Sequence, residues 1–318
     1  LLIFLMRFDI VCPDTFTIGR FDGEVTLKNT SLTFDGVDEK KIVDDFARDG
    51  FYLHRGLFNN QNISKAVTWL KAQDPKTLIK SWTDQEPAVP LSVYGEVHQD
   101  KNPVSNLAND PKILQVAGKL MNKPTYIRAS KVNLKAPWCG TVEYYHQDLV
   151  YWKNRGYLKD EMLTCAVFLQ KHKIHNAALH VFPGTHNLGF IPHQPFININ
   201  GLAKRMIPPE KLDELNKEHG LVAIEAEPGD ALFFHAGLVH GSSHNISPDG
   251  RMALFVQLNN IENKPIDTFS NVRQFNILRA NEEVKEASRR YQFFKEKLER
   301  QVKSDNPEFC PPIPDQEK

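Results

Sequence analysis

Apolar residues recur at two different spacings along the chain, and the change of spacing divides it into three zones. In the first zone, 1–125, apolar side chains fall three or four positions apart in several stretches, which predicts amphipathic helices. A weak, proline-interrupted pattern over 76–104 predicts an irregular surface segment. Helices are expected at 38–49, 62–72 and 111–120, and an extended segment at 50–53.

The second zone, 126–260, consists of short runs rich in Val, Ile, Phe and Thr, separated by turn residues. Many short strands with turn signals between them are typical of a β-sandwich or barrel. A helix that starts at Pro208-Pro209-Glu210 interrupts this zone, and 199–218 is expected to be an insertion over one end of the barrel. The clearest strands are expected at 164–169, 178–182, 221–225, 230–234 and 252–257.

The third zone, 261–318, contains a charged amphipathic helix at 280–303 and then a proline-rich tail. No repeat or Gly/Ser linker divides the chain, so we expect a single domain over 1–318, with 126–260 as its β core. The predicted fold is mainly β with flanking α-helices.

Charge and cysteine content narrow the classes of partner. Lys plus Arg and Asp plus Glu both number 39, and this zero net charge argues against nucleic acid. The four cysteines have no paired spacing, which predicts neither a zinc knuckle nor disulfides and favours a reduced, intracellular and cytoplasmic setting. The apolar run 1–8 is too short to span a bilayer. An upstream targeting segment and the oligomeric state stay open.

An imidazole and a carboxylate stand two residues apart at His146 and Asp148. In a strand, residues i and i+2 point to the same face, so one extended segment can offer both to one metal ion. Such a pair is weak evidence by itself, because a histidine near an aspartate is often a hydrogen-bonded surface pair. A second imidazole, His240, follows 94 residues later (240 − 146) among small residues. Two histidines and one carboxylate on one face of iron(II) leave three positions open for an oxo acid and dioxygen.

His235 and His244 are rival third ligands. We prefer His240 because Gly241 and Ser242 leave room around a metal, whereas His235 ends a strand and His244 enters a turn.

Arg251 stands eleven residues after His240 (251 − 240), at the start of an apolar run. A turn at 245–250 would bring the Arg251 strand back beside the His240 strand. An arginine in such a run is costly to bury without an anion, and a guanidinium fork suits the far carboxylate of 2-oxoglutarate. The plainer interpretation is an exposed residue at the end of a hairpin.

Taken in order, several segments resemble the phytanoyl-CoA dioxygenase family of iron(II) and 2-oxoglutarate oxygenases over about 46–260. The resemblance implies a double-stranded β-helix, also called a jelly roll and cupin-like, with helices packed outside. It implies Fe(II), 2-oxoglutarate and O2, with ascorbate as support for activity. The matching segments are 145–148 followed by Tyr151 and Trp152, 176–186, 227–235, and 238–245 leading to Arg251.

The resemblance assigns roles to individual residues. It implies His146, Asp148 and His240 as iron ligands. Arg251 would bind the far carboxylate of 2-oxoglutarate with Ser242 beside it, and Asn133 is the preferred further contact on 130–135. Ectoine hydroxylases share the pattern around Lys131 and Trp152, which makes both candidates for the substrate side, although Trp152 is equally a packed barrel aromatic. The retained Asp148 disfavours halogenation, and 174–178 departs from the family pattern, so the pocket rim is expected to differ.

The predicted function is oxidation of an unactivated C–H bond of a small molecule, with release of succinate and CO2. The ligand set serves hydroxylation, oxidative cyclisation and desaturation alike. Two alternatives stay open: a cupin-type metal barrel with non-oxygenase chemistry, and a hydroxylase of protein side chains. The insertion at 199–218 is a candidate lid. Lys131, His193, Lys204 and Arg205 could meet an acidic substrate, or are exposed surface residues.

Overall fold

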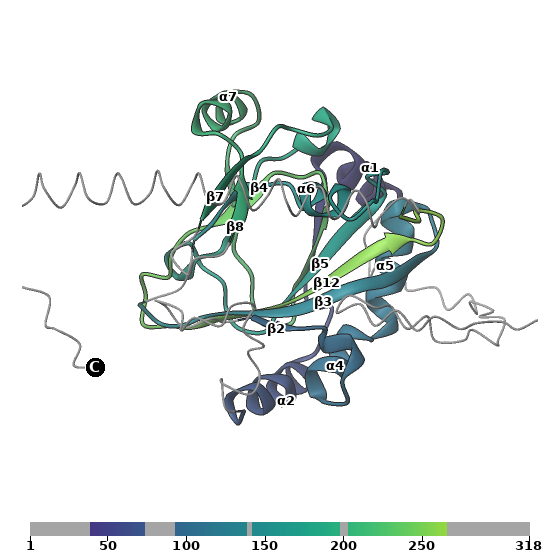
Figure 1. Cartoon of the computed structure of the whole chain (residues 1–318). Helices are drawn as coiled ribbons and strands as arrows, with labels where there is room; N and C mark the ends of the chain where they lie inside the picture. The colour runs from purple at the N-terminus through teal and green to yellow at the C-terminus, as the bar shows by residue number, and fades with distance from the viewer. Residues whose placement is uncertain (1–38, 74–92, 139–141, 198–202, 266–318) are drawn as a thin grey trace, which may run out of the picture.

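The short apolar runs of the second zone form the strands of two facing antiparallel sheets (Figure 1). The structure, a computed structural model, describes residues 39–73, 93–138, 142–197 and 203–265. The larger sheet has the strand order β1-β10-β5-β12-β3-β2 and the smaller one β4-β11-β6-β9. The large-sheet strands are β1 (Phe51–His54), β2 (Val93–Gly95), β3 (Thr125–Lys135), β5 (Met162–Phe168), β10 (Ala231–His235) and β12 (Arg251–Asn260). The small-sheet strands are β4 (Glu143–His146), β6 (Leu179–Val181), β9 (Val222–Ile224) and β11 (His240–Ser242).

Strand β5 shows why its sequence is apolar at every position rather than at every second one. Cys165 and Val167 pack on the outside with the helices, while Ala166 and Phe168 point between the sheets. Alternate side chains on a strand face opposite sides, so a strand buried on both faces reads as a continuous apolar run. The interior between the sheets is therefore built by one half of each central strand.

Four helices cover the outer face of the larger sheet (Figure 1). They are α1 (Glu39–Asp49), α2 (Asn60–Lys71), α4 (Pro103–Ala108) and α5 (Pro111–Met121). Asn59, Asn102 and Asp110 cap the last three through side-chain oxygens that accept backbone N–H groups of the first turn. This packing leaves the inner face of the sheet for chemistry.

Most predicted elements are confirmed. Helices α1, α2 and α5 and the five strands lie where the apolar spacing placed them. In the insertion, helix α7 (Pro209–His219) is confirmed, and a hairpin of β7 (Gln194–Ile197) and β8 (Ala203–Met206) precedes it. The segment 76–104 is not irregular throughout, because β2, a 3-10 turn η1 (Val97–Gln99) and the start of α4 lie in it. The predicted helix 280–303 lies outside the described residues.

One predicted strand pairing is wrong. Strand β12, which begins at Arg251, does not lie beside β11, which begins at His240. Strand β12 pairs with β3 and β5, and β11 pairs with β4 and β6. The eight residues 243–250 therefore cross from the smaller sheet to the larger one rather than closing a hairpin.

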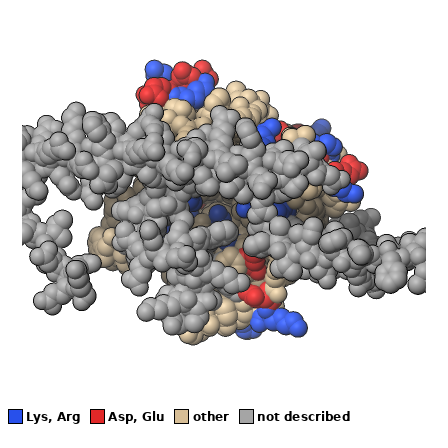
Figure 2. Space-filling view, in the orientation of Figure 1, with Lys and Arg blue, Asp and Glu red and all other residues tan. Residues whose placement is uncertain are grey.

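The surface of the described part carries both signs of charge. Figure 2 shows acidic and basic side chains mixed over α7, as the sequence of that helix requires. No helix within the described ranges is long and apolar enough to cross a membrane.

Candidate metal centre

Two imidazoles face each other across neighbouring strands at the inner side of the smaller sheet. His146 ends β4 and His240 begins β11, and the two residues are direct cross-strand partners. Their ring centroids lie 4.5 Å apart. Asp148 follows at the start of the short helix α6 (Leu149–Lys153), which turns its carboxylate back toward both rings.

The donor atoms of these three side chains converge on one point. Asp148 Oδ1 lies 3.7 Å from His146 Nε2 and 3.8 Å from His240 Nε2. One ligand atom from each residue lies within 4.8 Å of the others, and within the described ranges this is the one such group of three His, Cys, Asp or Glu residues. All three are buried or nearly so.

Hydrogen bonds fix the outer side of each ligand. The Nδ1 atoms of His146 and His240 lie 2.7 Å and 3.0 Å from the carbonyl oxygens of Tyr144 and Leu238. A carbonyl only accepts, so each Nδ1 carries the proton and each Nε2 keeps a lone pair for a metal. Thr164 Oγ1 donates to Asp148 Oδ2 over 2.9 Å, which leaves Oδ1 to face the histidines.

The protonation states also suit a cation. Burial, with His146 next to it, lowers the pKa of His240 to about 4, so its ring is neutral at pH 7. Burial alone would raise the pKa of Asp148, but the neighbouring His146 and His240 hold it well below its usual range. Metals need deprotonated ligands, and two histidines with one carboxylate form the facial triad of non-haem iron(II) oxygenases. The residues present therefore fit an iron(II) ion.

The triad opens into a cavity between the two sheets. Its lining includes Arg251 at the start of β12, Asn133 and Lys131 of β3, and Ser242 of β11. Lys131 and Asn133 share the inner face of β3 because they are two residues apart. The sequence-predicted ligands and co-substrate contacts thus line one space.

The guanidinium group that faces this cavity, that of Arg251, is buried. Arg251 is 2% exposed, and its Nη2 has no hydrogen-bond partner among the described residues. The amide oxygen of Asn133 is also buried and unpaired. Buried polar groups are nearly always hydrogen-bonded, so an unpaired guanidinium nitrogen beside a cavity is a candidate binding site for an anion.

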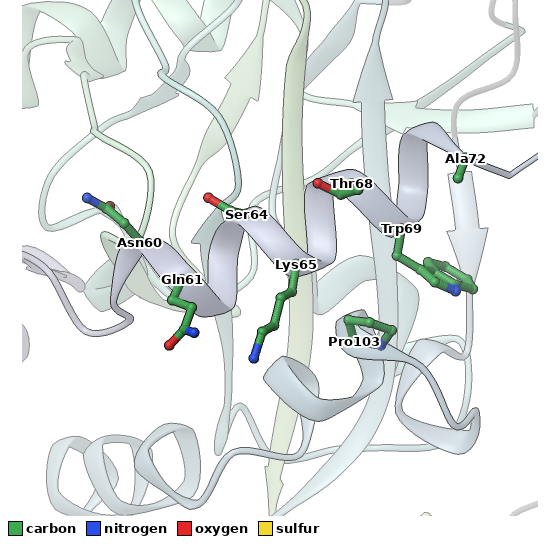
Figure 3. A pocket seen from close by; sticks show the side chains of 8 residues that line it. All are labelled: Asn60, Gln61, Ser64, Lys65, Thr68, Trp69, Ala72 and Pro103. Carbon is green, nitrogen blue, oxygen red and sulfur yellow. The ribbon is translucent and has the colours of Figure 1, made fainter.

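A second hollow lies on the outside of the molecule and has a different character (Figure 3). Polar residues of α2 line it together with Trp69 and Pro103, and none of its lining residues is a histidine, cysteine or carboxylate. Among the described residues, the one group of His, Cys, Asp or Glu side chains that could hold a metal ion is the triad in the inner cavity.

Comparison with known proteins identifies the family. The pattern of the phytanoyl-CoA dioxygenase (PhyH) family matches residues 46–253. The chain belongs to this family. Ectoine dioxygenase from Sphingopyxis alaskensis is 30% identical over 230 residues, which cover 69% of this chain and 75% of that protein. L-proline trans-4-hydroxylase from Streptomyces griseoviridis is 26% identical over 172 residues, 51% of this chain and 64% of that protein.

Solved structures give the same picture. The crystal structure of EctD from S. alaskensis with 2-oxoglutarate and 5-hydroxyectoine superimposes with a TM-score of 0.59 at 27% sequence identity, covering 72% of this chain and 78% of that one. A carbocyclase from nogalamycin biosynthesis, SnoK, shares the fold with a TM-score of 0.57 at 19% identity. The predicted jelly roll, the predicted family and the enzyme class, a non-haem iron, 2-oxoglutarate-dependent dioxygenase, are confirmed.

The rival histidines lie away from the triad of this dioxygenase. His235 accepts a hydrogen bond from the backbone N–H of Gly237 and packs against the ring of His186, at 5.2 Å between centroids. His244 is exposed in the crossing segment. His240 is thus the histidine that the fold brings to His146.

The remaining suggested substrate residues divide into two groups. Lys131 lines the cavity, whereas Trp152 packs in a buried cluster with Leu149 and Met162, under the guanidinium of Arg128. This placement fits the packed-aromatic interpretation of Trp152 and not a place on the substrate side.

Three polar residues that the sequence suggested as contacts for an acidic substrate have partners within the protein. Lys204 forms an ion pair with Glu143 at 3.1 Å. The backbone N–H of Arg205 donates to Tyr151 Oη, and His193 Nε2 accepts from the backbone N–H of Gln147.

One buried residue beside the site received no role from the sequence patterns. Lys135 is buried, and its Nζ donates to Ser242 Oγ at 2.8 Å and to the carbonyl of Ser243. Burial and the facing Arg251 lower the pKa of Lys135 to about 7. The two-residue period that joins Lys131, Asn133 and Lys135 is the signal that could have found it.

Proposed function

We propose that His146, Asp148 and His240 hold iron(II), and that 2-oxoglutarate lies between this iron and Arg251. The observation that carries the proposal is a single cavity lined by a complete two-histidine, one-carboxylate triad and by a buried guanidinium with an unpaired donor. A dicarboxylate with an oxo group at one end offers a chelating group for the metal and a second carboxylate for the guanidinium. With iron(II) and 2-oxoglutarate bound there, O2 would be the oxidant: one oxygen atom would go to the succinate formed with CO2, and the other would serve the oxidation of an unactivated C–H bond.

The protein's own residues orient the 2-oxoglutarate and shield it from water. The Arg251 guanidinium provides a planar fork for the far carboxylate, and Ser242, held by Lys135, adds a hydroxyl beside it. Asn133 projects from the same face of β3 and offers an amide to the co-substrate. Burial of these groups excludes water and strengthens each charge-assisted hydrogen bond.

The substrate is a small molecule that carries an anionic group, which Lys131 binds. Lys131 Nζ lies over the ring of Phe255 at 6.0 Å, and among the described residues no carboxylate is within ion-pair distance. Burial and the nearby Lys204 lower the pKa of Lys131 more than Asp148 and Glu143 raise it, so a bound anion would stabilise its charged form. Ectoine and L-proline, named by the relatives, both carry a carboxylate.

Hydroxylation is the favoured outcome, because two relatives of this chain are named as a dioxygenase and a hydroxylase. Oxidative cyclisation or desaturation requires the same ligands and differs only in how the substrate lies. Neither a cupin-type isomerase nor a side-chain hydroxylase of proteins has a comparable observation in its favour. The hairpin and α7 of the insertion are a candidate lid.

A panel of small carboxylates tests the proposal. Purified protein with iron(II), 2-oxoglutarate and ascorbate is incubated with amino acids, cyclic amino-acid derivatives and uncharged analogues of each, and succinate is measured. We expect a carboxylate substrate to raise succinate release above the uncoupled rate, and Lys131→Met to raise its KM about 10-fold or more. Equal stimulation by the uncharged analogues would contradict the proposed substrate class.

A further inference from the structure

The guanidinium of Arg251 is held from behind by a histidine far away in the sequence. Arg251 Nε donates to His172 Nδ1 over 3.2 Å. His172 is 0% exposed and Arg251 is 2% exposed, so water does not compete for this contact. The bond occupies the Nε edge of the guanidinium, while Nη2 has no partner among the described residues.

The ring of His172 is itself fixed on several sides. Its Nε2 donates to the carbonyl of Met252 over 3.2 Å, next to Arg251 in β12. Phe168 packs against the ring edge to face, with 4.4 Å between centroids. The backbone of His172 forms two hydrogen bonds with Ala226, 2.8 and 3.1 Å long. The imidazole thus has one orientation.

Only one protonation state satisfies both ring contacts. The carbonyl of Met252 cannot donate and Arg251 Nε cannot accept, so Nε2 carries the proton and Nδ1 is the acceptor. Burial and the adjacent Arg251 lower the pKa of His172 well below its usual value, which keeps the ring neutral. A neutral acceptor orients a guanidinium and leaves its positive charge intact, whereas a carboxylate in this place would neutralise that charge.

We propose that His172 is a positioning residue for the co-substrate: it holds Arg251 by Nε so that the Nη edge faces the 2-oxoglutarate carboxylate. The proposal rests on the proposed function, in which Arg251 binds that carboxylate. Lys135 stands opposite Arg251 in the register of β3 and β12 and repels the guanidinium, so the acceptor at His172 is what keeps it in place. Pre-orienting a flexible side chain lowers the entropy lost on binding.

The test measures binding of 2-oxoglutarate to protein loaded with manganese(II), which needs no turnover. His172→Phe removes the acceptor and keeps a ring, and we expect the Kd for 2-oxoglutarate to rise about 10-fold or more. His172→Asn, whose amide oxygen can stand where Nδ1 stands, is expected to remain within about threefold of wild type. The exposed His175, three residues away, gives the matched control His175→Asn, with no expected change.

Kinetics with iron(II) separate positioning from a general loss of structure. We expect His172→Phe to raise the KM for 2-oxoglutarate and to leave kcat at saturating 2-oxoglutarate within about twofold, because the iron ligands are untouched. A fall in kcat together with a rise in KM, equally large in both His172 variants, would overturn the positioning role.

Arg251→Leu distinguishes the two proposals. If it leaves 2-oxoglutarate binding unchanged, the proposed function is wrong; if it weakens binding while His172→Phe does not, only the inference about His172 is wrong. Should His172→Phe fail to fold, imidazole nitrogen NMR of the metal-free wild-type protein decides. We expect a neutral His172 ring protonated at Nε2 at pH 7, and a ring protonated at Nδ1 would overturn the proposal.

Discussion

Gly241, the residue after the ligand His240, gives a sharp test of how closely the two ligand strands are packed. A Cβ added at this glycine would lie 2.9 Å from the carbonyl oxygen of Glu143 and 2.9 Å from the ring of Tyr145. Both neighbours belong to β4, the strand that carries His146. Gly241→Ala therefore forces β11 and β4 apart beside the metal ligands.

The size of the effect follows from that overlap. The Tyr145 ring can rotate, but the Glu143 carbonyl is backbone and moves only with β4. Overpacking of this kind costs about 1–3 kcal/mol. In a domain of this size each kcal/mol lowers the thermal midpoint by about 2–4 °C, so the midpoint is expected to fall by about 2–12 °C. Separation of the His240 and His146 strands also weakens iron binding.

The assay compares Gly241→Ala with Gly95→Ala. Gly95 lies in β2, and nothing lies within 4 Å of the position where its Cβ would be added. Thermal unfolding and anaerobic iron(II) titration are measured for both variants. We expect both the midpoint and the iron affinity to fall in Gly241→Ala and neither to fall in Gly95→Ala. A Gly241→Ala protein with wild-type iron affinity would refute the close packing of the ligand strands.

Three further predictions concern the surroundings of the site. Gln147→Leu should lower the free energy of unfolding, measured in denaturant, by about 3 kcal/mol. The side-chain amide of Gln147 is fully buried and forms hydrogen bonds with the backbone of Gly189, Ile191 and Gly237. A loss below about 1 kcal/mol would contradict this. Asp230→Asn should cost about 2 kcal/mol, because the carboxylate accepts from Arg55 and from the backbone N–H groups of Gly56 and Glu227; Asp249→Asn, at an exposed position, is the control. Burial and the neighbouring His186 lower the pKa of His235 to about 4. Below pH 6.5 the unfolded chain therefore binds a proton at this histidine that the folded protein does not bind. Stability should therefore fall by about 1–2 kcal/mol between pH 6.5 and pH 5, and less in His235→Asn; parallel pH profiles for the two proteins would exclude this group as the cause.

Much of the fold can be predicted from the sequence, because the strands are buried on one or both faces. Strands β5, β10 and β12 appear as apolar runs of strand length bounded by turn residues, and the helices show three-to-four spacing. The pair His146 and Asp148 is also readable, since two ligands in one short segment need no knowledge of pairing.

Contacts across the fold leave no local signal. The direct pairing of His240 with His146 and the placement of β12 in the other sheet depend on how 243–250 crosses between the sheets. Crossing segments and hairpin loops of that length share the same composition. The contact of His172 with Arg251 joins positions 79 apart, and nothing around His172 marks it. Long-range pairing is set by the packing of whole sheets, which a single sequence does not display.

The proposed function requires that His146, Asp148 and His240 together hold one iron(II) ion. The most direct measurement is anaerobic iron(II) binding in His240→Ala and in His244→Ala, the exposed histidine four residues away, with succinate formation measured in the same samples. We expect about one tightly bound iron per chain and full succinate formation in His244→Ala, and loss of both in His240→Ala. Stoichiometric iron and unchanged succinate formation in His240→Ala would contradict it.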